Sequence, residues 1–140
     1  MASPDFLLAI DGFLKLADIL DGPGYMTAIA QRSRVIREWV MFLEDYPLIL
    51  APVSVKPPWP VNADLGGEAP VREIFWNDFR FTSAISVLGL PAAVTPVGLV
   101  GGHPVGVQII GRRFREDLCL DAAAAIEARV GVLTRQLWAR

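Results

Sequence analysis

The hydroxyl and amino groups that could begin nucleophilic chemistry in this sequence lie two residues apart, at Ser54 and Lys56. An activated serine needs a base within hydrogen-bonding reach, and residues two apart lie on one face of an extended strand. The pair is therefore one hypothesis for a nucleophile and its base. The opposing interpretation is a solvated surface loop, because several prolines surround the pair. The other serines lie outside any Gly-x-Ser-x-Gly pattern, and neither Gly66-Gly67 nor Gly101-Gly102 is followed by serine.

His103 and Cys119 are the single histidine and the single cysteine of the chain. A histidine can act as a general base, but His103 stands between a glycine and a proline with no acidic neighbour, which is typical of a solvated turn. Cys119 stands between two leucines in a helical stretch, where a free cysteine is normally a small buried hydrophobic residue. One histidine and one cysteine do not make the ligand cluster of a structural metal site. We therefore expect no metal site and no cofactor.

Asn77 and Asp78 precede an apolar helical stretch, and their simplest role is to cap that helix and complement its dipole. The glycines of 98–102 do not follow the order of a phosphate-binding loop. Taken together, these residues do not predict a self-contained active site. We assign no catalytic residue to this chain, and the sequence does not identify substrate-binding residues.

The composition is apolar for a chain of this size. The chain has 140 residues, of which 53% are hydrophobic and 20% charged, with a formal net charge of −2. The basic residues are scattered, so we expect no nucleic-acid partner. No apolar run approaches the roughly 18 residues of a membrane span, and no signal peptide is evident. A single cysteine fits a reducing cytoplasm. So much apolar surface indicates a chain that oligomerises or belongs to a larger protein.

Two helices are predicted before the first strand. Ser3-Pro4-Asp5 is a good helix start, and the run from Phe6 to Leu20 is apolar on nearly all sides, which predicts a buried helix. Asp21 to Gly24 ends it. Residues Tyr25 to Tyr46 are amphipathic and predict a longer helix with one polar face.

The rest of the chain alternates strands and helices. We predict a buried strand at Leu48–Pro52, an irregular connection over 53–72, and a pair of antiparallel strands joined by a turn at Gly98–Gly102. Gly106 would allow close backbone approach, and Gln108 would need internal hydrogen-bond partners. Three short strands cannot cover this many apolar helices, so the expected fold is α/β with an incomplete sheet. The predicted helices and paired strands are 74–88, 92–96, 105–110 and 117–129.

Several stretches, in order, resemble the end of amidase signature family proteins. They are Phe81-Thr82, Gly89-Leu90-Pro91-Ala92, Thr95-Pro96-Val97-Gly98, His103 to Gly111 and Phe114 to Leu120. The stretch from Arg37 to Pro58, with Tyr46-Pro47-Leu48-Ile49-Leu50-Ala51-Pro52, also resembles the family. The likeness is weakest over 1–24 and covers 25–140. One departure is Ser86, where many members have asparagine before the Gly-x-Pro-Ala turn.

The resemblance implies an amide (carbon–nitrogen) hydrolase with a mixed-sheet α/β/α fold and a Ser–Ser–Lys triad. The triad residues of the family lie upstream of the matched region, so none is carried over to this chain. Residues 1–140 are therefore predicted to be the C-terminal segment of a cytoplasmic amidase domain, inactive alone. The expected partner is the missing N-terminal amidase segment or a second copy of the chain. Two alternatives stay open. One is a non-catalytic binding module or one half of a split amidase. The other is new chemistry at Ser54, Lys56 or His103.

Overall fold

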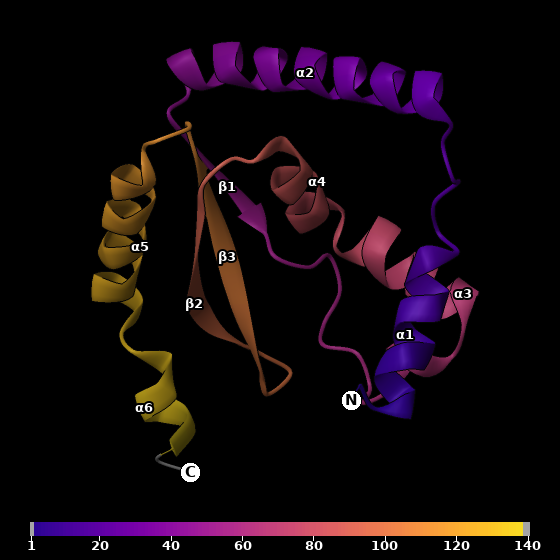
Figure 1. The fold of residues 1–140 in the computed structure, drawn as a ribbon. Helices are drawn as coiled ribbons and strands as arrows, with labels where there is room; N and C mark the ends of the chain where they lie inside the picture. Colours follow the sequence, from indigo (N-terminus) through magenta and orange to yellow (C-terminus); the bar gives the residue numbers. More distant parts are fainter. Residues whose placement is uncertain (1, 139–140) are drawn as a thin grey trace.

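The computed structural model describes residues 2–138 and forms an α/β fold around a three-stranded antiparallel sheet, which confirms the expected fold class. Figure 1 shows α5 on one side of the sheet, α4 on the other, α2 crossing above both, and α1 with α3 to one side. The strands are β1 (Leu48–Pro52), β2 (Ala92–Val100) and β3 (His103–Gly111). The helices are α1 (Pro4–Leu14), α2 (Gly22–Asp45), α3 (Glu68–Arg72), α4 (Arg80–Leu88), α5 (Glu116–Val130) and α6 (Leu133–Trp138).

Strand β3 is the central strand, in the order β1-β3-β2. Its antiparallel pairing with β2 confirms the prediction from the short connection. The predicted turn at Gly98–Gly102 was too long, because β2 continues to Val100 past a bulge between Pro96 and Gly98. The turn is only Gly101-Gly102, with φ of 59° and 83°. Positive φ at both central residues matches the right-handed twist of the strands, and glycine allows it at no steric cost.

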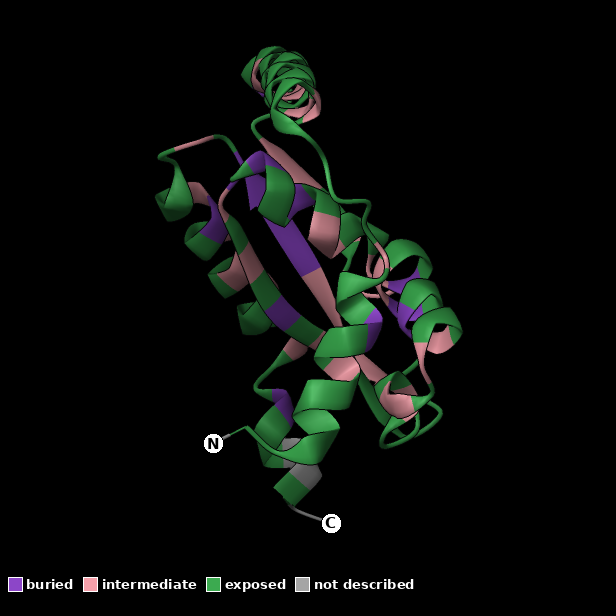
Figure 2. Cartoon of the chain, turned by 45° about the vertical axis from the view of Figure 1, so that its right-hand side comes forward, coloured by how far each residue is buried: buried purple, intermediate pink, exposed green. Residues whose placement is uncertain are grey.

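The core lies where α2 and α4 meet one face of the sheet. It contains five buried residues from four parts of the chain, namely Leu43, Ile85, Leu88, Leu90 and Ile110. Ile109, the neighbour of Ile110 on β3, is also fully buried. Because neighbouring strand residues point to opposite faces, β3 is covered on both sides, with α5 packing against β2 and β3. Figure 2 shows the buried residues along the middle of the sheet, while α2 is exposed along most of its length.

The first helix is shorter and less buried than predicted. Helix α1 starts at the expected cap, where Ser3 Oγ accepts from the Phe6 N–H at 3.2 Å, but it ends at Leu14 rather than Leu20. It packs mainly on α3 and the 3-10 turn at Ala63–Leu65, with Gly12 buried against Val71 and Phe13 against Phe75 of the π-helix. Leu14 is 69% exposed and Ile19 fully exposed. Helix length depends mainly on packing of an apolar face, and residues 15–20 are exposed except for the half-buried Leu16.

Helix α2 is confirmed, beginning three residues earlier than predicted at the Asp21 cap, whose carboxylate accepts from the Gly24 N–H at 2.8 Å. Its C-terminal half reaches the core through Val35, Ile36 and Trp39. Despite its length, neither α2 nor any other helix among residues 2–138 is apolar enough to cross a membrane.

The connection over 53–72 is only partly irregular, and the predicted helix at 74–88 is interrupted. Helix α3 begins at Glu68 with Pro70 in its first turn, where a missing N–H costs no helical hydrogen bond. It runs into a π-helix at Glu73–Asp78, which ends with a bond from the Phe79 N–H to Ile74 O. Such insertions occur often at functional sites. Here the wider turn precedes α4 and carries Asp78 into the interior.

Candidate functional site

Ser54 and Lys56 lie together, but not as a nucleophile and its base. Ser54 Oγ accepts from the Lys56 N–H at 3.2 Å and donates to Lys56 O at 3.0 Å, which closes a local turn. The Lys56 ammonium instead pairs with the Glu73 carboxylate and lies 3.2 Å from Asp78 Oδ1. The hydrogen bonds to Glu73 and to Asp78 raise the pKa of Lys56 above its ordinary value. An ammonium held by two carboxylates is a poor proton acceptor for Ser54.

Of the other two candidates, His103 lines one cleft with Ser54 and Lys56, whereas Cys119 is buried elsewhere. His103 is exposed at the first position of β3, and it takes part in no ion pair within residues 2–138. Cys119 is 2% exposed, and its Sγ donates weakly to Pro91 O at 3.8 Å. Burial raises the pKa of the Cys119 thiol, so it stays protonated, as its position between two leucines predicts. Over the described part of the chain, no three His, Cys, Asp or Glu side chains could jointly hold a metal.

Asp78 was wrongly predicted to cap a helix. The N-cap of α4 is Phe79, without a side-chain hydrogen bond, while the Asp78 side chain is 1% exposed. Its Oδ2 accepts from Trp59 Nε1 at 2.7 Å, and its backbone oxygen accepts from the Val55 N–H at 3.1 Å. Neighbouring residues alone give no signal for this role, because the partners lie some twenty positions earlier. The sequence would have predicted this role only if the proline-rich loop at 53–60 and the helix had been considered together.

The Asp78 cluster, formed by Lys56, Trp59, Glu73, Asn77 and Asp78, fastens the proline-rich loop to the π-helix. Asn77 Nδ2 donates to the Glu73 carboxylate, which also accepts a hydrogen bond from Lys56 Nζ. The Trp59 ring meets Phe79 edge to face at 4.6 Å between centroids. Nearby, Thr82 Oγ1 donates to Val53 O at 2.8 Å. A buried carboxylate needs such partners to stay charged, so this loop has a defined position despite lacking regular structure.

The fastened loop forms one wall of a cleft, and the β2–β3 hairpin forms the other. This loop cleft has a volume of 610 Å³. Its lining is mainly proline and valine, with Trp59, His103, Ser54 and the stem of Lys56 as the polar or aromatic parts. On the hairpin side, a Cβ on Gly106 would lie 3.3 Å from Thr95 O, which confirms the predicted close approach. The cleft can hold an apolar group, and it presents no activated nucleophile of its own.

Gln108 connects the hairpin to the strand that leads into the proline-rich loop. It is 2% exposed in the middle of β3, and its Nε2 donates to Pro52 O at 3.3 Å, which confirms that it needs an internal partner. The bond joins β3 to the end of β1, where the proline-rich loop begins. Ser86, the departure from the family pattern, donates within α4 to Thr82 O at 3.0 Å.

The Asp78 cluster should hold the loop only within a defined pH range. Burial raises the pKa of Asp78, but Trp59 and Lys56 outweigh it and hold that pKa below 3.8. Lys56 and Asn77 lower the pKa of Glu73 below 4.5, and the pKa of Lys56 lies above 10.5. The Asp78 cluster therefore contributes its full stabilisation of the folded chain at pH values between the ordinary carboxyl pKa and the ordinary lysine pKa. It is lost as pH falls through the lowered carboxyl pKa values or rises through the raised lysine pKa.

We expect the Trp59 indole N–H signal in NMR spectra to lose its hydrogen-bonded shift as pH is lowered from 5 to about 2, and Asp78→Asn to abolish this step. Asp64→Asn is the matched control, because Asp64 is an exposed carboxylate in the same connection. An unchanged Trp59 transition in Asp78→Asn would contradict the role given to Asp78.

Comparison with known proteins accounts for this architecture. The family model described as Amidase matches residues 11–120. The chain is 51% identical over 138 residues to an indoleacetamide hydrolase from Bradyrhizobium japonicum, and 52% identical over 139 residues to one from Bradyrhizobium diazoefficiens. A crystal structure of an amidase matches 80% of the chain at 30% identity, with a TM-score of 0.66. A 6-aminohexanoate cyclic dimer hydrolase shares the fold over 96% of the chain, with a TM-score of 0.71 at 22% identity.

The chain spans only 30% and 26% of the length of the two indoleacetamide hydrolases, although the matches cover 99% of the chain itself. The two solved structures are likewise covered over 26–30% of their length. The chain thus corresponds to a C-terminal part of larger amidases. The family match extends over most of the described α/β fold, from α1 to α5. The chain belongs to the amidase family.

Proposed function

We propose that this chain supplies the C-terminal part of an amide hydrolase, in which the nucleophile and its base come from the rest of the domain. The observation that carries the proposal is the pairing of Lys56 with Glu73 and Asp78. This pairing leaves Ser54 without a base inside a family whose members hydrolyse amides. In this proposal residues 25–140 form the matched region of the segment, and residues 1–24 carry its N-terminal helix. The single, buried Cys119 suits the reducing cytoplasm that we propose for it.

The segment's role would be to shape and wall the substrate site rather than to react. The loop cleft is apolar, and its walls are fixed by the Asp78 cluster and by the hairpin. A substrate held against a rigid wall reacts faster, because less orientational entropy has to be lost on the way to the transition state. The similarity to the two indoleacetamide hydrolases supports an arylacetamide as the substrate class.

A domain swap tests the proposal. We would replace the matching 30% of the Bradyrhizobium japonicum indoleacetamide hydrolase with residues 1–140 and measure ammonia release from indole-3-acetamide. We expect the chimera to turn over the amide and the chain alone to show no turnover. In the chimera, Ser54→Ala should leave kcat nearly unchanged although Ser54 lines the cleft, since Ser54 has no base and bonds only to the Lys56 backbone. Turnover by the chain alone that is lost in Ser54→Ala or Lys56→Ala would overturn the proposal.

A second function is an interaction module, or one half of a split amidase completed by another chain. The exposed apolar residues of α1 favour a surface that is covered by a partner, because contiguous apolar patches on monomers are usually interfaces. Mixing the chain with the separate N-terminal part of the Bradyrhizobium japonicum enzyme, and measuring binding and amide hydrolysis, distinguishes a split enzyme from an interaction module. Restored activity indicates a split enzyme. Stable binding without activity indicates an interaction module.

A further inference from the structure

Trp59 lines the loop cleft, and its ring is held in one position. Its Nε1 donates to the buried Asp78 carboxylate at 2.7 Å, and its ring meets Phe79 edge to face. These contacts leave Trp59 only half-buried, and it is among the residues that form the cleft wall. A side chain that is already fixed loses little conformational entropy when a ligand binds. Trp59 therefore presents a preset aromatic surface to the cleft.

Asp78 orients two side chains of this wall with its two oxygens. Its Oδ2 accepts from Trp59 Nε1, while its Oδ1 lies 3.2 Å from the Lys56 ammonium. Both Trp59 and Lys56 line the loop cleft. Because the Asp78 side chain is itself buried, it can act on a molecule in the cleft only through these two neighbours. Asp78 is thus a positioning residue for the wall.

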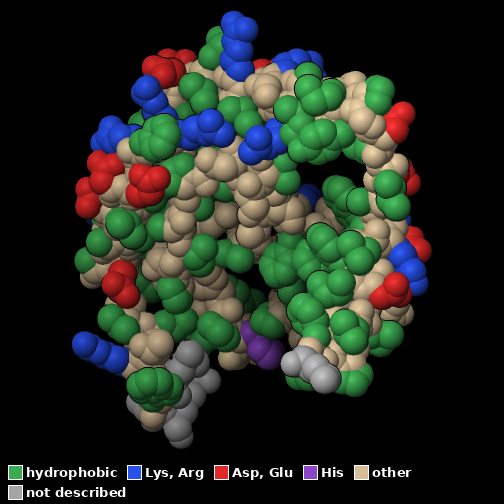
Figure 3. Space-filling model, viewed as in Figure 1, with side chains coloured by type: hydrophobic (Ala, Val, Ile, Leu, Met, Phe, Trp, Pro, Cys, Tyr) green, Lys and Arg blue, Asp and Glu red, His purple; other side chains and the backbone are tan. Residues whose placement is uncertain are grey.

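The hairpin wall of the loop cleft is apolar and open to solvent. Val94 and Val100 line it and are 60% and 62% exposed. Figure 3 shows His103, the single histidine of the chain, beside hydrophobic side chains in the lower part of the view. The cleft volume of 610 Å³ lies within the range of about 300–1,000 Å³ that is usual for small-molecule sites. An apolar group between Trp59 and the hairpin would cover valine surface that otherwise faces water.

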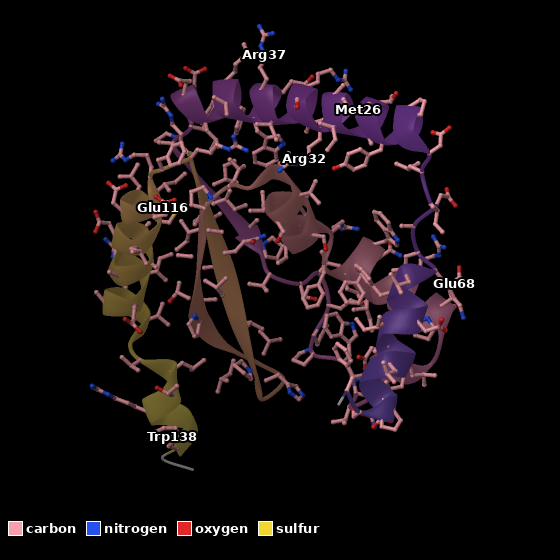
Figure 4. All side chains as sticks on the ribbon, viewed as in Figure 1. Met26, Arg32, Arg37, Glu68, Glu116 and Trp138 are labelled. Atoms are coloured by element: carbon pink, nitrogen blue, oxygen red, sulfur yellow. The ribbon has the colours of Figure 1, made fainter. Side chains whose placement is uncertain are left out.

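The lysine charge on the loop-cleft wall is already paired. Among the described residues that line the cleft, Lys56 is the only lysine or arginine, and its charge is compensated by Glu73 and Asp78. Figure 4 shows Arg32 and Arg37 on α2, at the opposite end of the sheet from the hairpin turn. A carboxylate entering the cleft would lose hydration without gaining an ion pair, whereas an uncharged amide loses much less. The lining therefore favours an uncharged ligand.

We propose that Trp59, positioned by Asp78, makes the loop cleft selective for an uncharged ligand with a flat aromatic ring that packs between the indole and the hairpin valines. This selectivity rests on the proposed function, in which the loop cleft walls the substrate site. An aromatic pair gains about two- to tenfold in affinity beyond burial, whereas a saturated ring of similar size gains burial alone. Hydrolysis turns an uncharged amide into a carboxylate, so the product is held less tightly than the substrate.

Ligand binding to the purified chain tests this selectivity without catalysis. Equilibrium dialysis would compare phenylacetamide, cyclohexylacetamide and phenylacetate at about pH 8, where histidine side chains are ordinarily uncharged. We expect phenylacetamide to bind about two- to tenfold more tightly than cyclohexylacetamide, and phenylacetate to bind more weakly than phenylacetamide. Tighter binding of phenylacetate that weakens with salt would reveal a free cation in the cleft and overturn the proposal. Absence of amide binding would overturn it as well.

Tryptophan signals show where the ring binds. In NMR spectra of the chain with isotope-labelled tryptophan, phenylacetamide should shift the Trp59 indole signal and leave those of Trp39 and Trp76 in place. Trp39 and Trp76 line a separate apolar cavity beneath α2. A shift of Trp39 or Trp76 without Trp59 would place the ring beneath α2 and contradict the proposal.

Substitutions separate selectivity from folding. Trp59→Leu should remove the preference for phenylacetamide over cyclohexylacetamide, and Trp59→Phe, which keeps a ring, should retain part of it. Asp78→Asn should lower the preference because it loosens the indole, and it decides the question if Trp59→Leu fails to fold. Trp76→Leu is the matched control, because Trp76 is an exposed tryptophan outside the loop cleft. A preference that survives these changes, or an equal loss of both amides, would overturn the proposal.

An active chimera distinguishes this selectivity from the proposed function. In it, kcat/KM for phenylacetamide should exceed that for cyclohexylacetamide, and Trp59→Leu should lower the ratio mainly through KM. A preference that depends on Trp59 in the chain alone, together with an inactive chimera, would overturn the proposed function and leave the selectivity standing. An active chimera whose ratio does not respond to Trp59→Leu would overturn the selectivity alone.

Discussion

Replacing Gly111 with alanine should destabilise the chain by about 1–3 kcal/mol, because the site has no room for a methyl group. A Cβ on Gly111 would lie 2.5 Å from Cys119 Sγ and 3.6 Å from Leu48 Cδ2. Gly111 ends β3, and Cys119 is buried on α5, so the methyl group would push the helix away from the sheet. Urea unfolding followed by circular dichroism measures the change in the free energy of unfolding.

The control is Gly98→Ala, because a Cβ at Gly98 would meet no atom within 4 Å and should change stability by no more than about 0.5 kcal/mol. The double variant Gly111→Ala with Cys119→Ala removes the clashing sulfur, so it should recover most of the stability lost in Gly111→Ala alone. If the double variant is simply the sum of the two losses, the clash is not the cause.

The chain alone should self-associate as its concentration rises. The exposed apolar side chains of α1 include Phe6, Leu7 and Leu14, at 56%, 58% and 69% exposure. Strands β1 and β2 are both edges of the sheet, with Leu50 and Val94 exposed on them. Open edges offer unpaired backbone groups, and a net charge of −2 gives little repulsion. Sedimentation velocity over a concentration series, with a dye for exposed apolar surface, measures the effect.

Leu7→Glu with Leu14→Glu should shift the distribution toward monomer and lower dye binding, because both substitutions place charge on the exposed face of α1. Arg34→Glu with Arg37→Glu also adds negative charge, on the exposed polar face of α2, and should have a smaller effect. A compact wild-type monomer at high concentration without dye binding would show that α1 does not drive association.

Local sequence determined those elements whose signals lie within a few residues. Helix α2 follows from its cap at Asp21 and its amphipathic period. The end of α4 at Leu88 agrees with the predicted helix over 74–88, and Gly89 follows it with φ of 64°, a conformation that glycine adopts readily. The β2–β3 hairpin follows from two apolar stretches separated by glycines, and the burial of Cys119 from its leucine neighbours.

Tertiary structure decided the features that depend on partners far away in sequence. Asp78 became a buried carboxylate because Lys56 and Trp59 reach it from the proline-rich loop, and Ser54 has no base because Lys56 is held there. Helix α1 stopped at Leu14 because the residues that follow it are mostly exposed, with Ile19 fully so. Helix α2 lies against α4 because Arg32 Nε donates to Val87 O and because its apolar side chains pack on the core. Periodicity reports how a segment meets its surroundings on average, whereas these outcomes depend on individual contacts between segments that only folding brings together.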